Sequence, residues 1–203
     1  MIVDYGMGNL KSIANMLNYL QGNFFISNKD EDVAKADVYI MPGVGAFGQA
    51  MQNLAELNIM DELAIHVLDK GKPVFGICLG MQLLAESSEE MGLHNGLGWI
   101  EGQVVHMQES DEYKLPHVGW NDVEFNRETL LFKGIPQSAE FYFDHTYQLL
   151  CRDEIVKACC HYKSTVVSVI QSNNIFASQF HPEKSHANGL RLFRNFLEIA
   201  ERM

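Results

Sequence analysis

The sequence predicts an α/β fold with a mainly parallel central sheet and a smaller antiparallel portion. Over the first 85 residues, short apolar runs alternate with segments whose apolar residues recur at helical spacing. This alternation is typical of right-handed βαβ units, which place their strands in parallel. From Gly92 onward glycines recur and helical periodicity is lost, which indicates short antiparallel strands and loops. We expect one domain spanning residues 1–203.

Composition and charge exclude several classes of protein. A hydrophobic content of 47% and a charged content of 20% are those of an ordinary globular chain. The formal net charge of −11 argues against nucleic acid or a membrane surface as partner. No apolar run approaches the roughly 20 residues of a membrane span, and the first residues lack the features of a secretory signal. The cysteines at 78, 151, 159 and 160 form no disulfide or metal spacing, so we expect a reducing, cytoplasmic compartment.

The first predicted strand, residues 1–5, runs into a turn that contains Gly6 and Gly8. Apolar residues at helical spacing then predict a helix over 10–20. The two glycines match part of the dinucleotide-binding pattern G-x-G-x-x-G, but Lys11 stands where the third glycine belongs. A tight strand-to-helix turn without a nucleotide is therefore the favoured interpretation.

A second strand is predicted at 24–26, and a third at 36–41 ends in Pro42-Gly43-Val44-Gly45. A glycine-rich turn after a buried strand either exposes backbone N–H groups to an anion or serves as an ordinary loop. An amphipathic helix is predicted over 50–68.

The stretch around Cys78 has the pattern of a sharp strand-to-helix elbow. A buried strand, 74–77, leads into Cys78, and the helix that follows is expected to begin near Met81. Gly76 and Gly80 flank the cysteine at positions where neighbouring backbone must pass closely. Free N–H groups at the helix start favour negative charge on the sulfur. A buried core cysteine is the alternative, but the Gly43 turn and Cys78 both end parallel strands, where sites form.

The region from Pro116 to Asn121 is rich in special residues, and a buried aromatic turn explains them. Further strands are predicted at 141–143 and 166–170. His106, Asp111 and His117 match no metal-ligand spacing, so neither a metal nor another cofactor is expected.

A strand over 175–180 ends at His181, because Pro182 disfavours helical backbone at the residue before it. Glu183 follows two residues on, within reach of the imidazole, and a closing helix is predicted over 189–203. A cysteine on an elbow with a His-x-Glu at a second strand end supplies a Cys-His-Glu triad. The residues by themselves therefore predict acyl transfer to a thiol.

Two motifs, GICLGMQLL around Cys78 and QFHPEKS at 179–185, resemble the signatures of class I glutamine amidotransferases. Within that class, five motifs resemble the glutaminase subunit of imidazole glycerol phosphate synthase: DYGMGNLKS (4–12), PGVGAF (42–47), PHVGWN (116–121), FYFDHTY (141–147) and HPEKS (181–185). The resemblance runs nearly end to end and implies a three-layer, flavodoxin-like fold.

The resemblance also implies roles. Cys78 would attack the glutamine side-chain amide, His181 would serve as base and then acid, and Glu183 would orient His181. The remaining positions fall into three sets: an oxyanion hole from Gly43, Val44 and Leu79; glutamine contacts from Gly80, Gln82, His145 and Thr146; and partner or gating contacts from Asn9, Lys11, Trp120, Asn121, Tyr142 and Lys184. In this family the Gly43–Val44 turn is thought to need a peptide rearrangement, which keeps the isolated glutaminase nearly silent.

The implied partner is a (β/α)₈-barrel cyclase that receives ammonia through a tunnel. Stretches 96–100 and 181–190 also resemble a branch that feeds ammonia to a sugar-modifying partner in surface-polysaccharide synthesis, and this alternative stays open. Asp144 departs from the apolar residue usual in the family, which affects the local glutamine contact. Two other hypotheses are a cysteine peptidase and a scaffold subunit that has lost activity, although an intact triad argues against the latter.

Overall fold

An eight-stranded sheet forms the centre of the computed structural model, which describes residues 1–108 and 111–203. Its strand order is β2-β1-β3-β4-β14-β13-β12-β9. The first five strands of that order pair in parallel, and the last three join by antiparallel pairing. The strands are β1 (Ile2–Val3), β2 (Ile26–Ser27), β3 (Tyr39–Met41), β4 (Val74–Ile77), β9 (Glu124–Phe125), β12 (Val156–Tyr162), β13 (Ser164–Ser172) and β14 (Ile175–Ser178).

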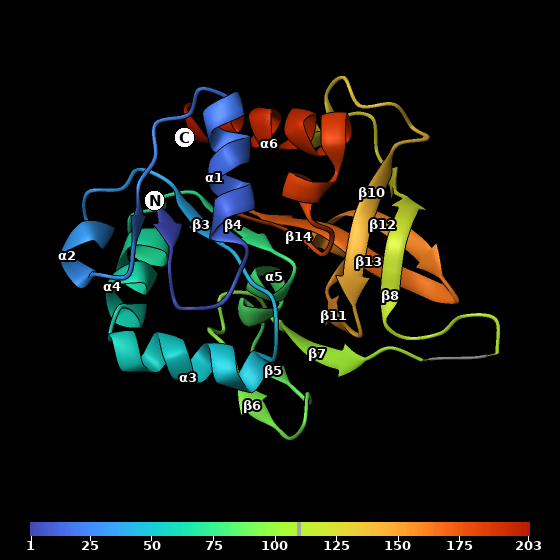
Figure 1. The fold of residues 1–203 in the computed structure, drawn as a ribbon, viewed down its shortest axis with the longest axis horizontal. Helices are drawn as coiled ribbons and strands as arrows, with labels where there is room; N and C mark the ends of the chain where they lie inside the picture. Colours follow the sequence, from blue (N-terminus) through green and yellow to red (C-terminus); the bar gives the residue numbers. More distant parts are fainter. Residues whose placement is uncertain (109–110) are drawn as a thin grey trace.

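Helices lie on both faces of this sheet (Figure 1). Helices α1 and α6 lie on one face, and α3, α4 and α5 on the other. The α-helices are α1 (Leu10–Tyr19), α2 (Asp30–Val33), α3 (Phe47–Leu57), α4 (Met60–Ala64), α5 (Leu79–Leu83) and α6 (His186–Ala200). A π-helical turn η1 (Ile65–Asp69) follows α4, and the 3₁₀ turns are η2 (Leu130–Phe132), η3 (Asp153–Ile155) and η4 (Pro182–Lys184).

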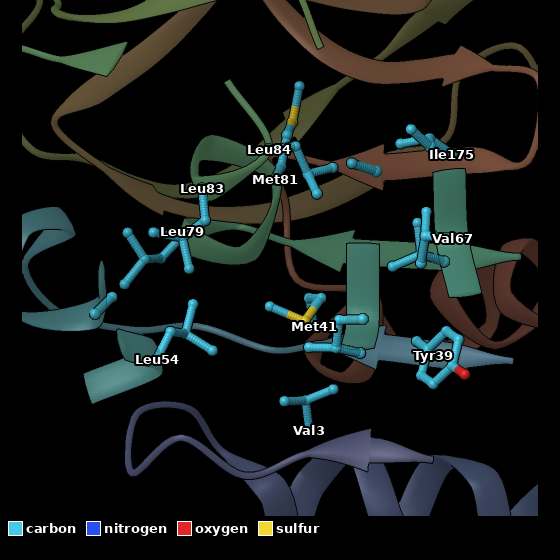
Figure 2. Close-up of a cluster of buried hydrophobic side chains, with 14 of the residues drawn as sticks. Val3, Tyr39, Met41, Leu54, Val67, Leu79, Met81, Leu83, Leu84 and Ile175 are labelled. Atoms are coloured by element: carbon cyan, nitrogen blue, oxygen red, sulfur yellow. The ribbon is translucent and has the colours of Figure 1, made fainter. Parts of the chain in front are cut away.

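Each face of the sheet has its own hydrophobic core. Alternate residues of a strand point to opposite faces, so Val74 packs with α3 and α5 while Phe75 packs with α1 and α6. Figure 2 shows part of the first core, where Leu54 and Leu79 lie near Met41 of β3. Burial on both faces explains why the central strands are continuous apolar runs without polar alternation.

Two smaller sheets complete the fold, and their strand pairs are antiparallel with one exception. Strands β8 (His117–Asp122) and β10 (Glu140–His145) form a pair, and a four-stranded sheet has the order β11-β7-β5-β6. Its strands are β5 (Ser87–Ser88), β6 (His94–Asn95), β7 (Gly102–His106) and β11 (Tyr147–Cys151). The β8–β10 pair lies on the right of Figure 1, beside β12 and β13 of the large sheet.

The predicted fold class is confirmed, while several element bounds differ. The helix predicted over 50–68 is divided into α3, α4 and η1, because Asn58 has a left-handed φ of 54° that ends α3. The elbow helix begins at Leu79, directly after Cys78. The closing helix begins at His186, three residues before its predicted start.

All four cysteines are free thiols. Within residues 1–108 and 111–203, none of the helices has the length and apolar character needed to cross a membrane. In the same ranges, no group of three or more His, Cys, Asp or Glu side chains is placed to hold a metal ion.

Candidate active site

The turn at Cys78 brings three backbone segments into direct contact. Cys78 has φ 54° and ψ −108°, a strained conformation for a residue with a side chain. A Cβ added at Gly76 would lie 2.7 Å from the Gly80 carbonyl oxygen, and one at Gly80 would overlap the carbonyl oxygen of Met41. The expected reason for both glycines is therefore confirmed: β3, β4 and the start of α5 pack backbone against backbone.

Strand β14 brings His181 to the same edge of the sheet. The backbone N–H of Cys78 donates to Ser178 of β14 at 2.8 Å, and His181 follows three residues later. Both backbone polar groups of His181 are hydrogen-bonded. Its N–H donates to the Tyr142 carbonyl at 2.9 Å, and its carbonyl accepts from the Ser185 hydroxyl at 2.6 Å. Local hydrogen bonds thus set the imidazole position before any ligand contributes.

Glu183 fixes the orientation of the imidazole. Its Oε1 accepts the Nδ1–H of His181 at 2.7 Å, and both side chains are almost fully buried. This contact leaves Nε2 of His181 for the thiol. Burial lowers the pKa of His181, but the Cys78 sulfur and the Glu183 carboxylate outweigh burial and raise this pKa to about 10. The site therefore favours an imidazolium beside the sulfur.

The sulfur of Cys78 is buried, with two further polar neighbours. Its Sγ lies 3.8 Å from the backbone carbonyl oxygen of Asp144 and 3.7 Å from Nε2 of Gln179. The first is an acceptor for a thiol, and the second is a donor toward the sulfur. Sequence reasoning did not assign a role to Gln179, although it lies within the QFHPEKS motif.

A cavity of about 340 Å³ opens beside the thiol. It is lined by Val44, Gly45, Cys78, Leu79, Gln82, Glu90, Pro116, Asp144, His145, Thr146 and Tyr147. The structure thus brings six predicted site residues together around one space. Gly43 and Gly80 support its wall, since a Cβ on Gly43 would lie 2.7 Å from the Gly80 backbone nitrogen.

Two side chains in the cavity wall present acceptors to a ligand. Both N–H groups of the Gln82 amide are committed, to the Tyr147 carbonyl at 3.0 Å and to Oε1 of Gln179 at 3.1 Å. Gln82 therefore offers a ligand its carbonyl oxygen. Glu90 adds a carboxylate, which is held in place because its Oε2 accepts from the Phe47 N–H at 2.7 Å. Sequence reasoning missed Glu90, which reaches the cavity because its loop folds back onto the start of α3.

His145 lies in the cavity wall with both ring nitrogens bonded to protein. Its Nδ1–H donates to the Tyr147 carbonyl at 2.8 Å, and its Nε2 accepts from Nδ1–H of His117 at 2.9 Å. Asn121 donates to Nε2 of His117 at 3.3 Å. Burial lowers the pKa of His145 to about 3 and that of His117 to about 4, so both rings are neutral near pH 7. His145 therefore positions the Tyr147 backbone and brings no charge to the cavity.

Several predicted partner residues share the surface of the β8–β10 pair. Trp120 and Tyr142 are cross-strand neighbours with ring centroids 6.0 Å apart, and Trp120 is 44% exposed. Nζ of Lys184 lies 5.2 Å from the centre of the Tyr142 ring and 3.9 Å from Oδ2 of Asp144. The unusual Asp144 thus points its carboxylate at Lys184, while its backbone carbonyl faces the thiol.

The other two predicted partner residues belong to α1. The Asn9 side chain caps this helix by accepting from the Ser12 N–H at 3.1 Å, and Lys11 is exposed in its first turn. Helix α1 packs against η4, the turn that carries Glu183 and Lys184. Both sets of predicted partner residues therefore adjoin η4.

A thiol at an elbow, a buried His–Glu pair and a cavity at the carboxyl end of a parallel sheet are the arrangement that acyl transfer to a cysteine requires. The model of the family "Glutamine amidotransferase class-I" matches residues 1–200. The chain belongs to this family, and it is a glutamine-dependent enzyme.

Relatives agree with this assignment, and a solved structure has the same fold. The chain is 43% identical to imidazole glycerol phosphate synthase subunit HisH 1 of Campylobacter jejuni strain RM1221, over 98% of both chains. It is 46% identical to subunit HisH of Chlorobium luteolum, over 97% of this chain and 98% of that protein. A crystal structure of a glutamine amidotransferase superposes with a TM-score of 0.77 at 23% identity over 98% of both chains, which supports the fold.

Proposed function

We propose that this chain is the glutaminase subunit of an imidazole glycerol phosphate synthase and that it hydrolyses glutamine to glutamate and ammonia. The observation that carries the proposal is the buried His181–Glu183 contact of 2.7 Å beside the Cys78 thiol, at the wall of a cavity that contains Gln82 and Glu90. The names of relatives that are 43% and 46% identical over nearly the whole chain support the particular synthase.

The cavity suits the amino-acid end of glutamine. The Glu90 carboxylate and the Gln82 carbonyl oxygen are acceptors for the α-ammonium group, and Thr146 also lines the cavity. With its charged end held there, the glutamine side chain extends toward Cys78. Binding of the charged end of glutamine, away from the reacting atoms, positions the amide carbon for attack.

The reaction then follows from the proton held by His181. The Cys78 thiolate attacks the amide carbon, and the imidazolium of His181 gives its proton to the amide nitrogen. The carbon–nitrogen bond breaks, ammonia leaves, and a glutamyl thioester remains on Cys78. Neutral His181 next takes a proton from water as the water attacks the thioester, which releases glutamate and restores the thiolate–imidazolium pair.

We infer that backbone donors stabilise the negative oxygen of each tetrahedral intermediate. The N–H of Leu79 is free at the start of α5, and the Gly43–Val44 turn packs against Leu79 and Gly80. The Tyr5 hydroxyl donates to the Pro42 carbonyl and so fixes the start of this turn. We infer that a peptide rearrangement at Gly43–Val44 completes the oxyanion hole when the partner binds.

The proposed partner is a (β/α)₈-barrel cyclase that forms a heterodimer with this chain in the cytoplasm and takes up the ammonia. Its docking surface comprises Trp120, Asn121, Tyr142 and Lys184 on β8, β10 and η4, together with Asn9 and Lys11 of α1. This surface lies directly beside the site, because Lys184 follows Glu183 and Asp144 contacts both Lys184 and the thiol.

The proposal is tested by replacing Cys78 with serine and measuring glutamate release in the presence of the barrel partner. We expect loss of turnover by at least about a thousandfold, since the covalent step requires the thiolate. Cys151→Ser, which changes a free cysteine on β11, is the matched control and should retain activity. Turnover that survives Cys78→Ser would sink the proposal.

The ammonia acceptor needs a separate assay. Coupled turnover with a cyclase and its imidazole precursor supports the histidine pathway. Coupled turnover only with a sugar-modifying synthase would instead support the surface-polysaccharide branch.

A further inference from the structure

Gln179 is a fully buried polar side chain that the reaction sequence above does not use. It lies between β14 and His181, and its backbone N–H donates to the Ser168 carbonyl of β13 at 2.9 Å. Its amide nitrogen lies 3.7 Å from the sulfur of Cys78, and its amide oxygen accepts from Gln82. The Gln179 amide thus lies between the nucleophile Cys78 and the cavity residue Gln82, where it can affect the chemistry of the sulfur.

The surrounding hydrogen bonds determine which way the Gln179 amide faces. The carbonyl oxygen of Tyr147 is an acceptor only, so the Gln82 atom 3.0 Å away from it must be the amide nitrogen. That nitrogen carries a second N–H, and the atom that faces it at 3.1 Å is therefore the oxygen of Gln179. The NH₂ group of Gln179 consequently points at the sulfur.

The same network holds Gln82 in place. The Tyr147 carbonyl also accepts from Nδ1–H of His145, whose other nitrogen accepts from His117. The Tyr147 carbonyl is an acceptor only, so both N–H groups of Gln82 stay committed, and reversing the Gln179 amide would bring two NH₂ groups into contact. The donor toward Cys78 is thus fixed by the protein and needs no reorganisation during the reaction.

We propose that Gln179 is a further catalytic residue, whose side-chain N–H donates to the Cys78 thiolate, and that Gln82 is the positioning residue that orients it. This inference deepens the proposed function, because it concerns the nucleophile of that reaction. A hydrogen bond to an ionised acceptor is stronger than one to a neutral acceptor, and burial strengthens it further. Gln179 therefore stabilises the thiolate form before attack, together with the imidazolium of His181.

The proposal predicts the pH dependence of thiol reactivity in the isolated full-length chain. The rate at which iodoacetamide alkylates Cys78 is measured against pH, with the modified peptide identified by mass spectrometry. Gln179→Met removes the donor at similar size, and we expect the midpoint of alkylation to rise by about one pH unit, so that the rate at pH values below the midpoint of the unchanged chain falls about tenfold. Gln179→Glu keeps the shape but faces the sulfur with an oxygen, and the midpoint should rise at least as far.

Gln148→Met is the matched control, because Gln148 is a buried glutamine on β11 that makes no contact with the sulfur. Its alkylation profile should equal that of the unchanged chain. Circular dichroism and the melting temperature establish that each variant is folded, and Gln179→Asn, whose shorter amide falls away from the sulfur, replaces any Gln179 variant that is not.

An unchanged alkylation midpoint in a folded Gln179→Met or Gln179→Asn chain would overturn the proposal. The outcome is separate from that of the proposed function. If the Gln179 variants shift the midpoint but the unchanged chain releases no glutamate with any partner, the role of Gln179 is supported and the glutaminase function is rejected. If the unchanged chain releases glutamate but the Gln179 variants leave the midpoint unshifted, the glutaminase function is supported and the role of Gln179 is rejected.

Discussion

At the scale of single residues, the proton on His181 links structure to reactivity. The pKa of this imidazole is about 10 because the Cys78 sulfur and the Glu183 carboxylate together outweigh the effect of burial. Of these two groups, only Glu183 can be replaced without removing the nucleophile. Its charge therefore sets the upper pH at which His181 still carries the proton that the departing ammonia needs.

Glu183→Gln should move the alkaline limb of the pH–rate profile to lower pH. The substitution keeps an oxygen near Nδ1 of His181 but removes the negative charge, so the pKa of His181 falls and the imidazolium is lost earlier as pH rises. We expect the turnover rate at pH 8 to fall by about 100-fold. The measurement is glutamate release by the complex between pH 6 and 10.

Glu198→Gln provides the control, because Glu198 is an exposed residue of α6. Its pH–rate profile should coincide with that of the unchanged chain. An alkaline limb that stays in place in Glu183→Gln would show that Glu183 does not control the protonation of His181.

At the scale of elements, the site depends on how closely β3 approaches α5. Gly80→Ala should destabilise the chain by about 3 kcal/mol or more, because the added Cβ would overlap the backbone carbonyl oxygen of Met41, which no rotamer can relieve. Urea unfolding measures the loss. Gly22→Ala is the matched control, since the nearest atom to its Cβ would lie at 3.5 Å, an ordinary contact. Equal stabilities for the two variants would contradict the close approach.

At the scale of the whole molecule, the buried pair His117 and His145 couples three strands. His117 on β8 stacks on Phe143 of β10 and on Tyr162 of β12, with centroid distances of 4.6 and 4.0 Å. Burial lowers the pKa values of His117 and His145 to about 4 and about 3, below the ordinary value of 6.5. The unfolded chain therefore binds protons at these groups before the folded chain does.

Stability should consequently fall as the pH decreases. The contribution of the pair is fully present above pH 6.5 and is lost progressively as pH falls through about 4 and then about 3. His117→Phe keeps the stacking but removes one of the two titrating groups, so its free energy of unfolding should depend less steeply on pH between 6.5 and 4. At pH 7.5 the variant should be less stable by about 1–3 kcal/mol, because Nε2 of His145 loses its donor.

Urea unfolding at several pH values tests this expectation. The comparison is the slope of unfolding free energy against pH for the two chains. If the slope is the same with and without His117, other groups cause the loss of stability at low pH.

The sequence predicted the parts of the fold and site that have a local cause. Gly76, Gly80 and Pro182 mark backbone turns within a few residues of the groups they position, so Cys78, His181 and Glu183 were identifiable without a structure. Gln179 and Glu90 carry no such mark. Their roles depend on contacts across the fold, with Gln82 of α5 and with the N–H of Phe47 at the start of α3. The break at Asn58 escaped prediction because apolar periodicity continues through it.

The proposed docking surface combines four elements, β8, β10, η4 and α1, that are far apart in the sequence. Trp120 is its largest exposed side chain, and large aromatic residues at the centre of an interface supply much of the binding energy. Trp120→Ala should therefore weaken binding of the barrel partner by about 2 kcal/mol, or about thirtyfold in Kd.

Isothermal titration calorimetry with the cyclase subunit measures this effect. The fold should survive the substitution, since the Trp120 ring is 44% exposed and stacks mainly on the exposed ring of His186. Leu130→Ala is the control: Leu130 is 61% exposed, but it belongs to η2 and lies outside the docking surface. Its Kd should be unchanged.

Because Lys184 follows Glu183 and pairs with Asp144, whose carbonyl faces the thiol, loss of Trp120 should also reduce partner-stimulated glutamate release at subsaturating partner. Equal Kd values for Trp120→Ala and the unchanged chain would move the docking surface to another face.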